Sequence, residues 1–323
     1  MPLIDMSLAQ LDEYTGRNPK PADFDAFWDS SLSEMKAIDP QVELIPYELD
    51  APFAECFELR FTGAGGARVY AKYLRPKNPP KPHPAIVEFH GYSGNSGEWS
   101  DKLKFVARGY SFASMDCRGQ GGKSEDVGGT IGNTLRGQII RGLDDAVAGR
   151  PEKLYFRNVF LDTAQLAGIV MGFDEVDAAR VGAMGGSQGG GLTLACAALE
   201  PRIKLAAPVF PFLCDYKRVW EMDQAVNAYD ELKTYFRQFD PLHENEEAIW
   251  TALGYIDNQH LAPRIKAEIL MFVGLMDAVC PPSTQYAAYN KITSKKSTMI
   301  FPDYGHEGLP GSGDAAYNFF GKL

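Results

Sequence analysis

The sequence has few cysteines and histidines for its length, and neither residue type follows a metal-binding or disulfide spacing. Its 323 residues include 5 Cys and 5 His. The cysteines are odd in number and widely separated: Cys56, Cys117, Cys196, Cys214 and Cys280. Because zinc sites and disulfide frameworks need closely spaced or paired cysteines, we expect neither. We expect most of these thiols to be small buried side chains.

Basic residues are outnumbered, and long apolar runs are missing. The 32 Lys and Arg stand against 42 Asp and Glu, a formal net charge of −10. A field of this sign repels the phosphates of nucleic acids and anionic lipids. The most apolar stretches, 205–214 and 269–276, are too short to cross a bilayer, and the first residues lack the pattern of a signal peptide. We therefore expect a cytoplasmic protein that binds neither nucleic acid nor membranes.

The order of the predicted elements indicates a mostly parallel sheet with helices on both faces. The first 80 residues predict an amphipathic helix over 24–35 and two antiparallel strands over 57–61 and 69–73, joined by a turn. Strands then alternate with helices. The later strands are predicted at 85–89, 111–115, 181–184, 204–209, 269–273 and 298–301, with helices at 99–109, at 152–171 and directly after residue 187. We expect one α/β domain over 1–323, with an N-terminal elaboration over 1–80 and a core over 81–323.

A G-x-S-x-G pattern, Gly185-Gly186-Ser187-Gln188-Gly189, lies between a predicted strand and a predicted helix. A nucleophile elbow has this position, because its sharp turn exposes the serine hydroxyl above the edge of the sheet. Glycine neighbours permit the close backbone approach, and the helix N-terminus faces developing negative charge. The pattern also fits a turn of small residues that only allows tight packing. Ser187 is therefore a candidate nucleophile that needs partners.

A serine hydroxyl at neutral pH needs a base to become nucleophilic. His306 follows the last predicted strand, in a loop whose glycines, Gly305 and Gly308, allow it to fold over the elbow. His90 also follows a strand but precedes the serine. The remaining histidines lie in a proline-rich loop or in helical surroundings: His83, His243 and His260. We predict that His306 is the base.

An imidazole that acts as a base is oriented by a carboxylate. Asp277 comes directly after the penultimate predicted strand, and the chain order Ser187, Asp277, His306 is typical of α/β-hydrolases. Asp303 lies too near His306 on the same loop to reach its Nδ1 easily, and Asp257 lies in a predicted helix–loop segment. We predict that Asp277 is the orienting acid.

The oxyanion of a tetrahedral intermediate needs N–H donors. In an elbow, one donor is the backbone N–H of the residue after the serine, here Gln188. The second usually comes from a loop after an earlier strand. The segment His90-Gly91-Tyr92-Ser93-Gly94 has that position, which makes the N–H of Tyr92 the candidate. The same segment also fits a glycine-rich turn without this role.

Further motifs connect these residues with a known family. Beside the elbow, which continues as Gly190-Gly191, they are Leu11-Asp12-Glu13-Tyr14-Thr15-Gly16, Phe57-Glu58-Leu59-Arg60-Phe61-Thr62-Gly63, Arg118-Gly119-Gln120, Gly274-Leu275-Met276-Asp277, Cys280-Pro281-Pro282-Ser283-Thr284 and His306-Glu307. Together they run through nearly the whole chain. The sequence resembles carbohydrate esterase family 7, which contains acetyl xylan esterases and cephalosporin C deacetylases.

The resemblance implies the α/β-hydrolase fold and a serine esterase that deacetylates small substrates, such as acetylated xylo-oligosaccharides or cephalosporin C. Ser187 would be the nucleophile, His306 the base and Asp277 the acid. The N–H groups of Tyr92 and Gln188 would form the oxyanion hole. The resemblance implies no metal or organic cofactor, and a homo-oligomer, a hexamer.

Two segments have an expected role other than chemistry. The Arg118-Gly119-Gln120 motif is expected to hold the active-site loops. The glycine-rich loop at 121–142 is expected to shape the mouth of the pocket, and with it the substrate preference. The sequence itself does not define the natural alcohol of the ester.

Two other functions remain open on the same fold. Serine peptidases of this fold usually carry a large gating domain, and roughly 80 residues ahead of the first core strand are too few for a propeller. A binding protein with a hydrolase-like fold would normally have lost a member of the triad, whereas Ser187, Asp277 and His306 are all present. The sequence therefore favours an enzyme that hydrolyses esters of short acyl groups.

Overall fold

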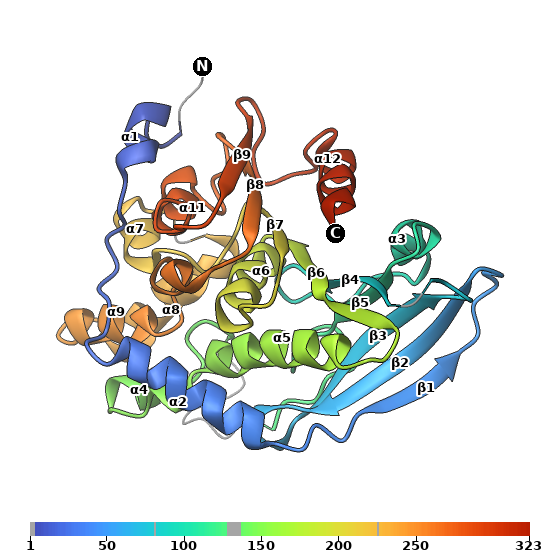
Figure 1. The fold of residues 1–323 in the computed structure, drawn as a ribbon. Helices are drawn as coiled ribbons and strands as arrows, with labels where there is room; N and C mark the ends of the chain where they lie inside the picture. The colour runs from blue at the N-terminus through green and yellow to red at the C-terminus, as the bar shows by residue number, and fades with distance from the viewer. Residues whose placement is uncertain (1–3, 81, 128–136, 225) are drawn as a thin grey trace.

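A twisted sheet runs through the centre of the computed structural model, which describes residues 4–80, 82–127, 137–224 and 226–323 (Figure 1). Its described strands are β1 (Glu43–Tyr47), β2 (Ala54–Thr62), β3 (Arg68–Pro76), β4 (His83–Phe89), β5 (Ser111–Met115), β6 (Val176–Gly186), β7 (Leu205–Val209), β8 (Glu268–Gly274) and β9 (Lys296–Phe301). They follow the order β1-β2-β3-β5-β4-β6-β7-β8-β9.

The sheet combines an antiparallel beginning with a parallel core. β1, β2, β3 and β5 pair antiparallel in succession, and every neighbouring pair from β5 through β4, β6, β7 and β8 to β9 is parallel. This confirms the predicted α/β-hydrolase fold with an antiparallel N-terminal extension. Since parallel strands end at the same edge of a sheet, the loops that follow β4, β6, β8 and β9 meet there.

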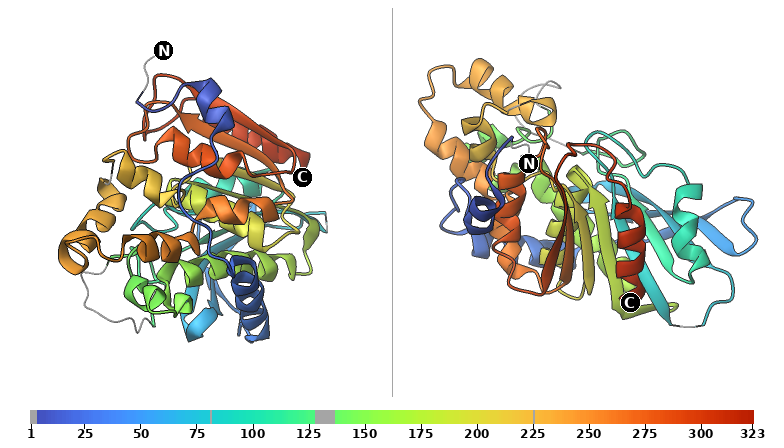
Figure 2. Two further views of the ribbon diagram at one scale, coloured as in Figure 1. Left: turned by 90° about the vertical axis from the view of Figure 1, so that its left-hand side faces the viewer. Right: turned by 90° about the horizontal axis from the view of Figure 1, so that it is seen from above.

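Helices cover both faces of the sheet, as the two views in Figure 2 show. The described α-helices are α1 (Leu8–Glu13), α2 (Phe24–Ala37), α3 (Leu103–Ala107), α4 (Leu143–Val147), α5 (Tyr155–Met171), α6 (Gln188–Leu199), α7 (Tyr216–Glu221), α8 (Asp230–Phe239), α9 (Glu246–Gly254), α10 (Asn258–Leu261), α11 (Pro282–Tyr289) and α12 (Ser312–Phe319). Within β4, Val87 belongs to the core that contains α5 and α6, and Ile86 to the core that contains α3 and α12. Because both faces of the strand are covered, its central residues, 84–87, are all apolar.

The N-terminal helix α2 packs into the same core as the sheet. Its buried residues include Phe24, Trp28 and Met35, three members of the predicted apolar stripe. The Trp28 ring stacks on Phe160 of α5 with 6.0 Å between ring centroids, and its Nε1 donates to the carbonyl of Tyr255. The pattern of spacing in the sequence therefore identified the face of α2 that packs inward.

Two of the departures of the structure from the predicted elements have a clear local reason. α5 begins at Tyr155 rather than at residue 152, because Pro151–Lys153 forms a separate 3-10 turn. β1 was not predicted, since it is an edge strand with a proline and mostly exposed side chains, and so has no apolar alternation. Of the glycine-rich loop at 121–142, residues 128–136 lie outside the described residues.

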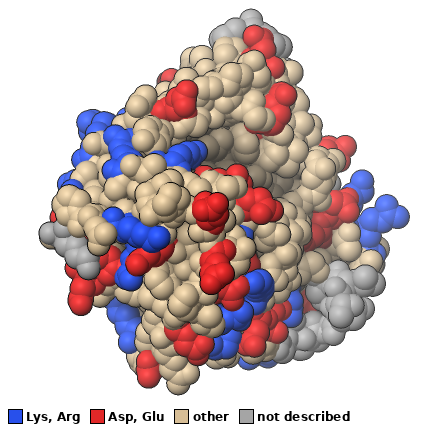
Figure 3. Space-filling model, turned by 90° about the vertical axis from the view of Figure 1, so that its right-hand side faces the viewer, with Lys and Arg blue, Asp and Glu red and all other residues tan. Residues whose placement is uncertain are grey.

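The core contains the cysteines, and the surface carries charges of both signs. All five cysteines are buried and free. Acidic and basic side chains are interspersed on the face seen in Figure 3, with several acidic groups at the rim of a hollow. None of the helices in the described ranges is long and apolar enough to span a membrane.

Candidate active site

Ser187 occupies a strained turn between β6 and α6. Its backbone has φ 58° and ψ −119°, in the region that residues other than glycine rarely adopt. The turn is tight because β4 passes directly beneath it. A Cβ on Gly189 would lie 2.0 Å from the carbonyl oxygen of Phe89, and one on Gly185 would lie 2.5 Å from the same atom. The glycines of the motif are therefore required by close backbone approach.

His306 bridges the serine and a carboxylate. Its Nε2 lies 2.9 Å from Oγ of Ser187, and its Nδ1 lies 2.8 Å from Oδ2 of Asp277. Because a carboxylate only accepts, Nδ1–H donates to Asp277 and Nε2 is left to accept from the serine hydroxyl. The Asp277 side chain is completely buried, while that of His306 is 21% exposed. The structure thus brings the three predicted residues together in the order that moves a proton from serine to imidazole.

Backbone donors hold the carboxylate of Asp277. Its Oδ1 accepts from the N–H groups of Val279 and Cys280, each at 2.8 Å, while Oδ2 faces the imidazole. These hydrogen bonds fix the orientation of the carboxylate. The loop after β8 therefore presents Asp277 in one geometry to His306.

The rival residues from the sequence are engaged elsewhere. Nδ1–H of His90 donates to the carbonyl of Gly91 at 2.7 Å, and its Nε2 accepts from the N–H of Cys117 at 2.9 Å. Both nitrogens of His90 are therefore occupied, and burial lowers the pKa of its imidazole. Asp257 is buried against the backbone N–H of Asp215, and Asp303 is exposed.

The two residues predicted to supply the oxyanion donors, Gln188 and Tyr92, adjoin Ser187 in the chain and in its cavity respectively. Gln188 is the first residue of α6, so its N–H belongs to the helical turn that has no intrahelical acceptors. Tyr92 follows β4 and lines a cavity of about 590 Å³ together with Ser187 and His306. Apolar side chains form part of this wall: Tyr92, Phe212, Ala228 and Val279.

The Arg118-Gly119-Gln120 motif connects the loops around the site. The guanidinium of Arg118 makes two hydrogen bonds to Asp162, at 2.7 and 2.6 Å, in a fully buried ion pair. The Gln120 side chain accepts from the N–H of Ser93, and its amide pairs with the side-chain amide of Gln188 at 2.9 to 3.0 Å. These contacts agree with the predicted loop-holding role and join the segment around Tyr92 to the elbow.

Sequence reasoning missed two residues that contact the site. Phe210, with φ 30°, packs its ring against that of His306 in a tilted arrangement, with 4.4 Å between the ring centroids and 48° between the ring planes. Cys280 is buried, and its backbone N–H donates to Oδ1 of Asp277 at 2.8 Å. Phe210 comes shortly after the predicted strand β7, and Cys280 comes shortly after β8. This position at the ends of parallel strands is the sequence signal that would have identified both residues as part of the site.

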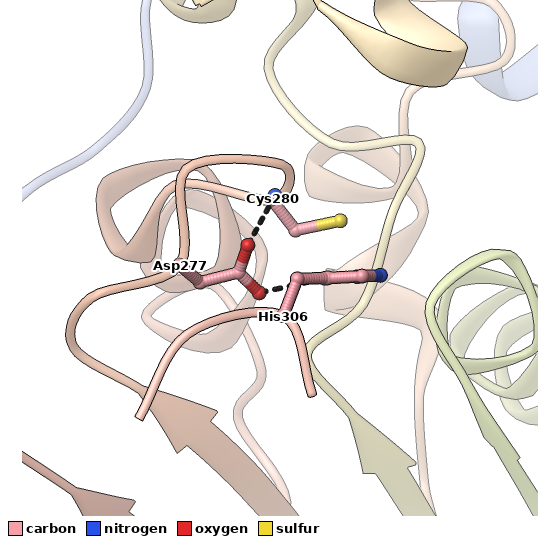
Figure 4. Close-up of side chains that lie close together, drawn as sticks. All are labelled: Asp277, Cys280 and His306. Carbon is pink, nitrogen blue, oxygen red and sulfur yellow. Dashed lines mark hydrogen bonds and ion pairs between the residues drawn. The ribbon is translucent and has the colours of Figure 1, made fainter. Parts of the chain in front are cut away.

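The site also contains the metal-ligand types Asp, Cys and His. One ligand atom each from Asp277, Cys280 and His306 lies within 4.8 Å of the others (Figure 4). However, both carboxylate oxygens already accept hydrogen bonds, and burial raises the pKa of the Cys280 thiol well above its ordinary value. Since a thiol binds metal as the thiolate, this arrangement fits proton transfer between Ser187 and His306 better than metal binding.

Comparison with known proteins gives consistent matches over the chain. The family model described as acetyl xylan esterase (AXE1) matches residues 1–323. The chain is 58% identical to acetyl xylan esterase 1 from Thermoanaerobacterium sp. JW/SL YS485, with a TM-score of 0.95 and 98% of each chain covered. It is 36% identical to the acetyl xylan esterase from Paenibacillus sp. R4, with a TM-score of 0.93 and coverage of 98% of this chain and 100% of that one.

A curated relative is longer than this chain. The sequence is 27% identical over 304 residues to the acetyl esterase Axe7A of Xylanibacter ruminicola, and the match covers 92% of this chain. It covers 65% of the relative, so the chain spans slightly less than two thirds of the length of that protein.

Proposed function

This chain belongs to the acetyl xylan esterase (AXE1) family, and we propose that it is a serine esterase that removes acetyl groups from small acetylated carbohydrates. The observation that carries this proposal is the hydrogen-bonded chain Asp277–His306–Ser187 at a nucleophile elbow. The names of the similar solved structures support the choice of an acetyl ester on a carbohydrate as substrate.

In the first half of the proposed reaction, Oγ of Ser187 attacks the acetyl carbonyl carbon while Nε2 of His306 takes the hydroxyl proton. The carbonyl oxygen becomes an oxyanion, which accepts from the N–H groups of Gln188 and Tyr92. The bond between the carbonyl carbon and the sugar oxygen then breaks. The imidazolium of His306 gives its proton to that oxygen, so the deacetylated sugar leaves and Ser187 carries the acetyl group.

In the second half, His306 takes a proton from a water molecule, whose oxygen attacks the acetyl carbon of the acetyl-enzyme. The second tetrahedral intermediate uses the same N–H donors. When it collapses, the imidazolium returns the proton to Oγ of Ser187 and acetate is released. Asp277 stays ionised throughout and stabilises the imidazolium in both halves.

The lining of the site supports an apolar acyl group, and the preference for a short one is proposed from the family resemblance. The cavity beside Ser187 has apolar side chains from Tyr92, Phe212 and Val279 close to His306, which suits a methyl group better than a charged one. A second cavity of about 420 Å³ shares Ser187 and is lined by Glu88 and Lys102 as well. The acetyl ester of cephalosporin C is a second substrate that we propose from the family resemblance.

Acetate release from a panel of acetylated xylo-oligosaccharides and from cephalosporin C tests this function. We expect release by the wild-type protein and, for Ser187→Ala, a loss of about 10⁶ in kcat. Ser33→Ala, at an exposed serine of α2 that lines neither cavity, is the matched control and should keep full activity. Retained turnover in Ser187→Ala would contradict the assignment of the nucleophile.

Acyl-chain length and reaction class are tested with p-nitrophenyl acetate, p-nitrophenyl octanoate and an aminoacyl anilide. We expect hydrolysis of the acetate, much slower hydrolysis of the octanoate and none of the anilide. Equal rates on the two esters would contradict a pocket for short acyl groups, and cleavage of the anilide would favour a peptidase. From the family resemblance we also propose a hexamer, for which light scattering should give six times the mass of the chain.

A further inference from the structure

The segment that carries the proposed oxyanion donor Tyr92 is held through the next residue, Ser93. Ser93 has φ 57°, a backbone conformation that needs support from its surroundings. Its N–H donates to Oε1 of Gln120 at 2.9 Å. Its hydroxyl accepts from Nε2 of Gln138, also at 2.9 Å. Two glutamines from other parts of the chain thus fix the residue that adjoins Tyr92.

Gln138 is placed in turn by a carboxylate on α8. Oε2 of Glu231 accepts from the backbone N–H of Gln138 at 2.8 Å and from that of Ile140 at 3.2 Å. The approach is close. Gly137 has φ 67°, and a Cβ there would lie 2.3 Å from the same carboxylate oxygen. A glycine at 137 is therefore needed for the backbone to wrap around Glu231.

The position of Glu231 is energetically unfavourable for a carboxylate. Its Oε1 is buried and has no hydrogen-bond partner among the residues that the structure describes. Burial raises the pKa of Glu231 to about 7, despite the backbone donors that oppose this shift. Packing of α8 does not need a carboxylate here, since the apolar residues Leu232, Tyr235 and Phe236 bury the helix. Holding the 138–140 backbone is the contact that Glu231 does make.

The same helix leads back to the cavity. Asn227 and Ala228, in the 3-10 turn that precedes α8, line the cavity of Ser187 together with Tyr92. Glu231 is three residues further along the chain, so one short segment contacts both the cavity and the loop at 138–140. A shift of this segment relative to the 138–140 loop would therefore move Gln138 with respect to Ser93.

We propose that Glu231 and Gln138 are positioning residues of the esterase, which act in series on Ser93 to hold the N–H of Tyr92 at the oxyanion. The proposal rests on the proposed function and assigns neither residue any contact with substrate. An oxyanion contact forms in the transition state and not with the bound ester, so its loss lowers kcat and kcat/KM together.

The test compares p-nitrophenyl acetate kinetics of Gln138→Ala, Glu231→Ala and Glu231→Gln. Gln138→Ala should lower kcat about tenfold and change KM less than about twofold. Complete loss of an oxyanion donor lowers kcat by a factor of about 10² or more. The effect is smaller here because the N–H of Tyr92 is still present and is only held less firmly. Glu231→Ala should have a similar effect. Glu231→Gln keeps an acceptor oxygen for the backbone N–H groups and should retain most of the wild-type kcat. Gln238→Ala, at an exposed glutamine of α8, is the matched control.

A double variant distinguishes a chain of contacts from separate structural damage. If the residues act in series, Gln138→Ala combined with Glu231→Ala should be no slower than the slower single variant. The proposal would be overturned if the losses of kcat in the two single variants multiplied in the double variant. It would also be overturned if Gln138→Ala kept the wild-type kcat, or if the variants changed KM alone. Wild-type protein without esterase activity would instead contradict the proposed function. The melting temperature of Gln138→Ala should stay at the wild-type value, so that its loss of kcat is not a loss of folded protein.

Discussion

Nε2 of His306 lies 2.9 Å from Oγ of Ser187, although 119 residues separate the two along the chain. The parallel sheet explains this contact, because the loops after β6 and β9 leave the same edge. The imidazole is further held by the hydrogen bond to Asp277 and by contact with the tilted ring of Phe210. The four residues come from the loops after four different strands, so the site depends on the fold and not on any local segment.

Asp277 is expected to be required for orientation of the imidazole. Asp277→Asn keeps the shape but removes the acceptor that fixes Nδ1–H, so kcat should fall by about 10³ to 10⁴. Asp303→Asn, at the exposed rival on the histidine loop, should leave kcat unchanged. Steady-state kinetics on p-nitrophenyl acetate measures both, and equal losses in the two variants would contradict the assignment.

Gly189 is expected to tolerate no side chain. A Cβ there would meet the backbone oxygen of Phe89 at 2.0 Å, which only a movement of β4 or α6 relieves. Gly189→Ala should therefore lower the free energy of unfolding by about 3 kcal/mol and reduce activity. Gly313→Ala in α12 has open space around its Cβ and should be neutral or stabilising by up to about 1 kcal/mol. Urea denaturation distinguishes the two; a stable, active Gly189→Ala would be inconsistent with the described elbow.

Breaking the buried Arg118–Asp162 pair should be costly. Asp162→Asn leaves the guanidinium of Arg118 buried without its counter-charge, and we expect a loss of about 3 to 5 kcal/mol in the free energy of unfolding. Asp177→Asn removes one partner of the more exposed pair with Arg180 and should hardly move the denaturation midpoint. Similar midpoints for both variants would mean that the buried pair does not hold the loops.

Glu231 makes stability depend on pH. Its folded pKa of about 7 exceeds the ordinary value of 4.5, so the folded protein binds this proton more tightly than the unfolded chain does. The free energy of unfolding therefore falls as pH rises through this interval, by about 3 kcal/mol at most. Glu231→Gln removes this titratable group. The melting temperature of the variant minus that of the wild type should therefore increase from about pH 5 to about pH 8. A difference between the two that is independent of pH would contradict the buried carboxylate.

The sequence predicted those parts of the fold that follow from local patterns. The central strands are apolar on both sides, and the glycines around Ser187 mark a turn without room for side chains. β1 escaped prediction because an exposed edge strand needs no apolar alternation. α5 begins three residues later than the sequence predicted, because Pro151 favours a separate 3-10 turn ahead of the helix.

The partners of the candidate site were less predictable than its chemistry. Ser187, Asp277 and His306 could be selected from chain order and strand ends. The contacts of Gln120, Gln138 and Glu231 are different, because they join segments that are remote in sequence and form no motif with one another. Only the three-dimensional arrangement brings an acid on α8 to the loop that holds Ser93.

The most direct test of the central claim is the site of labelling by a fluorophosphonate, which reacts with an activated serine. Peptide mass spectrometry of the labelled wild-type protein should find the adduct on Ser187. Labelling should be lost in His306→Ala and kept in His243→Ala, an exposed histidine remote from the triad. An adduct on another serine, or undiminished labelling of Ser187 without the imidazole of His306, would contradict the account.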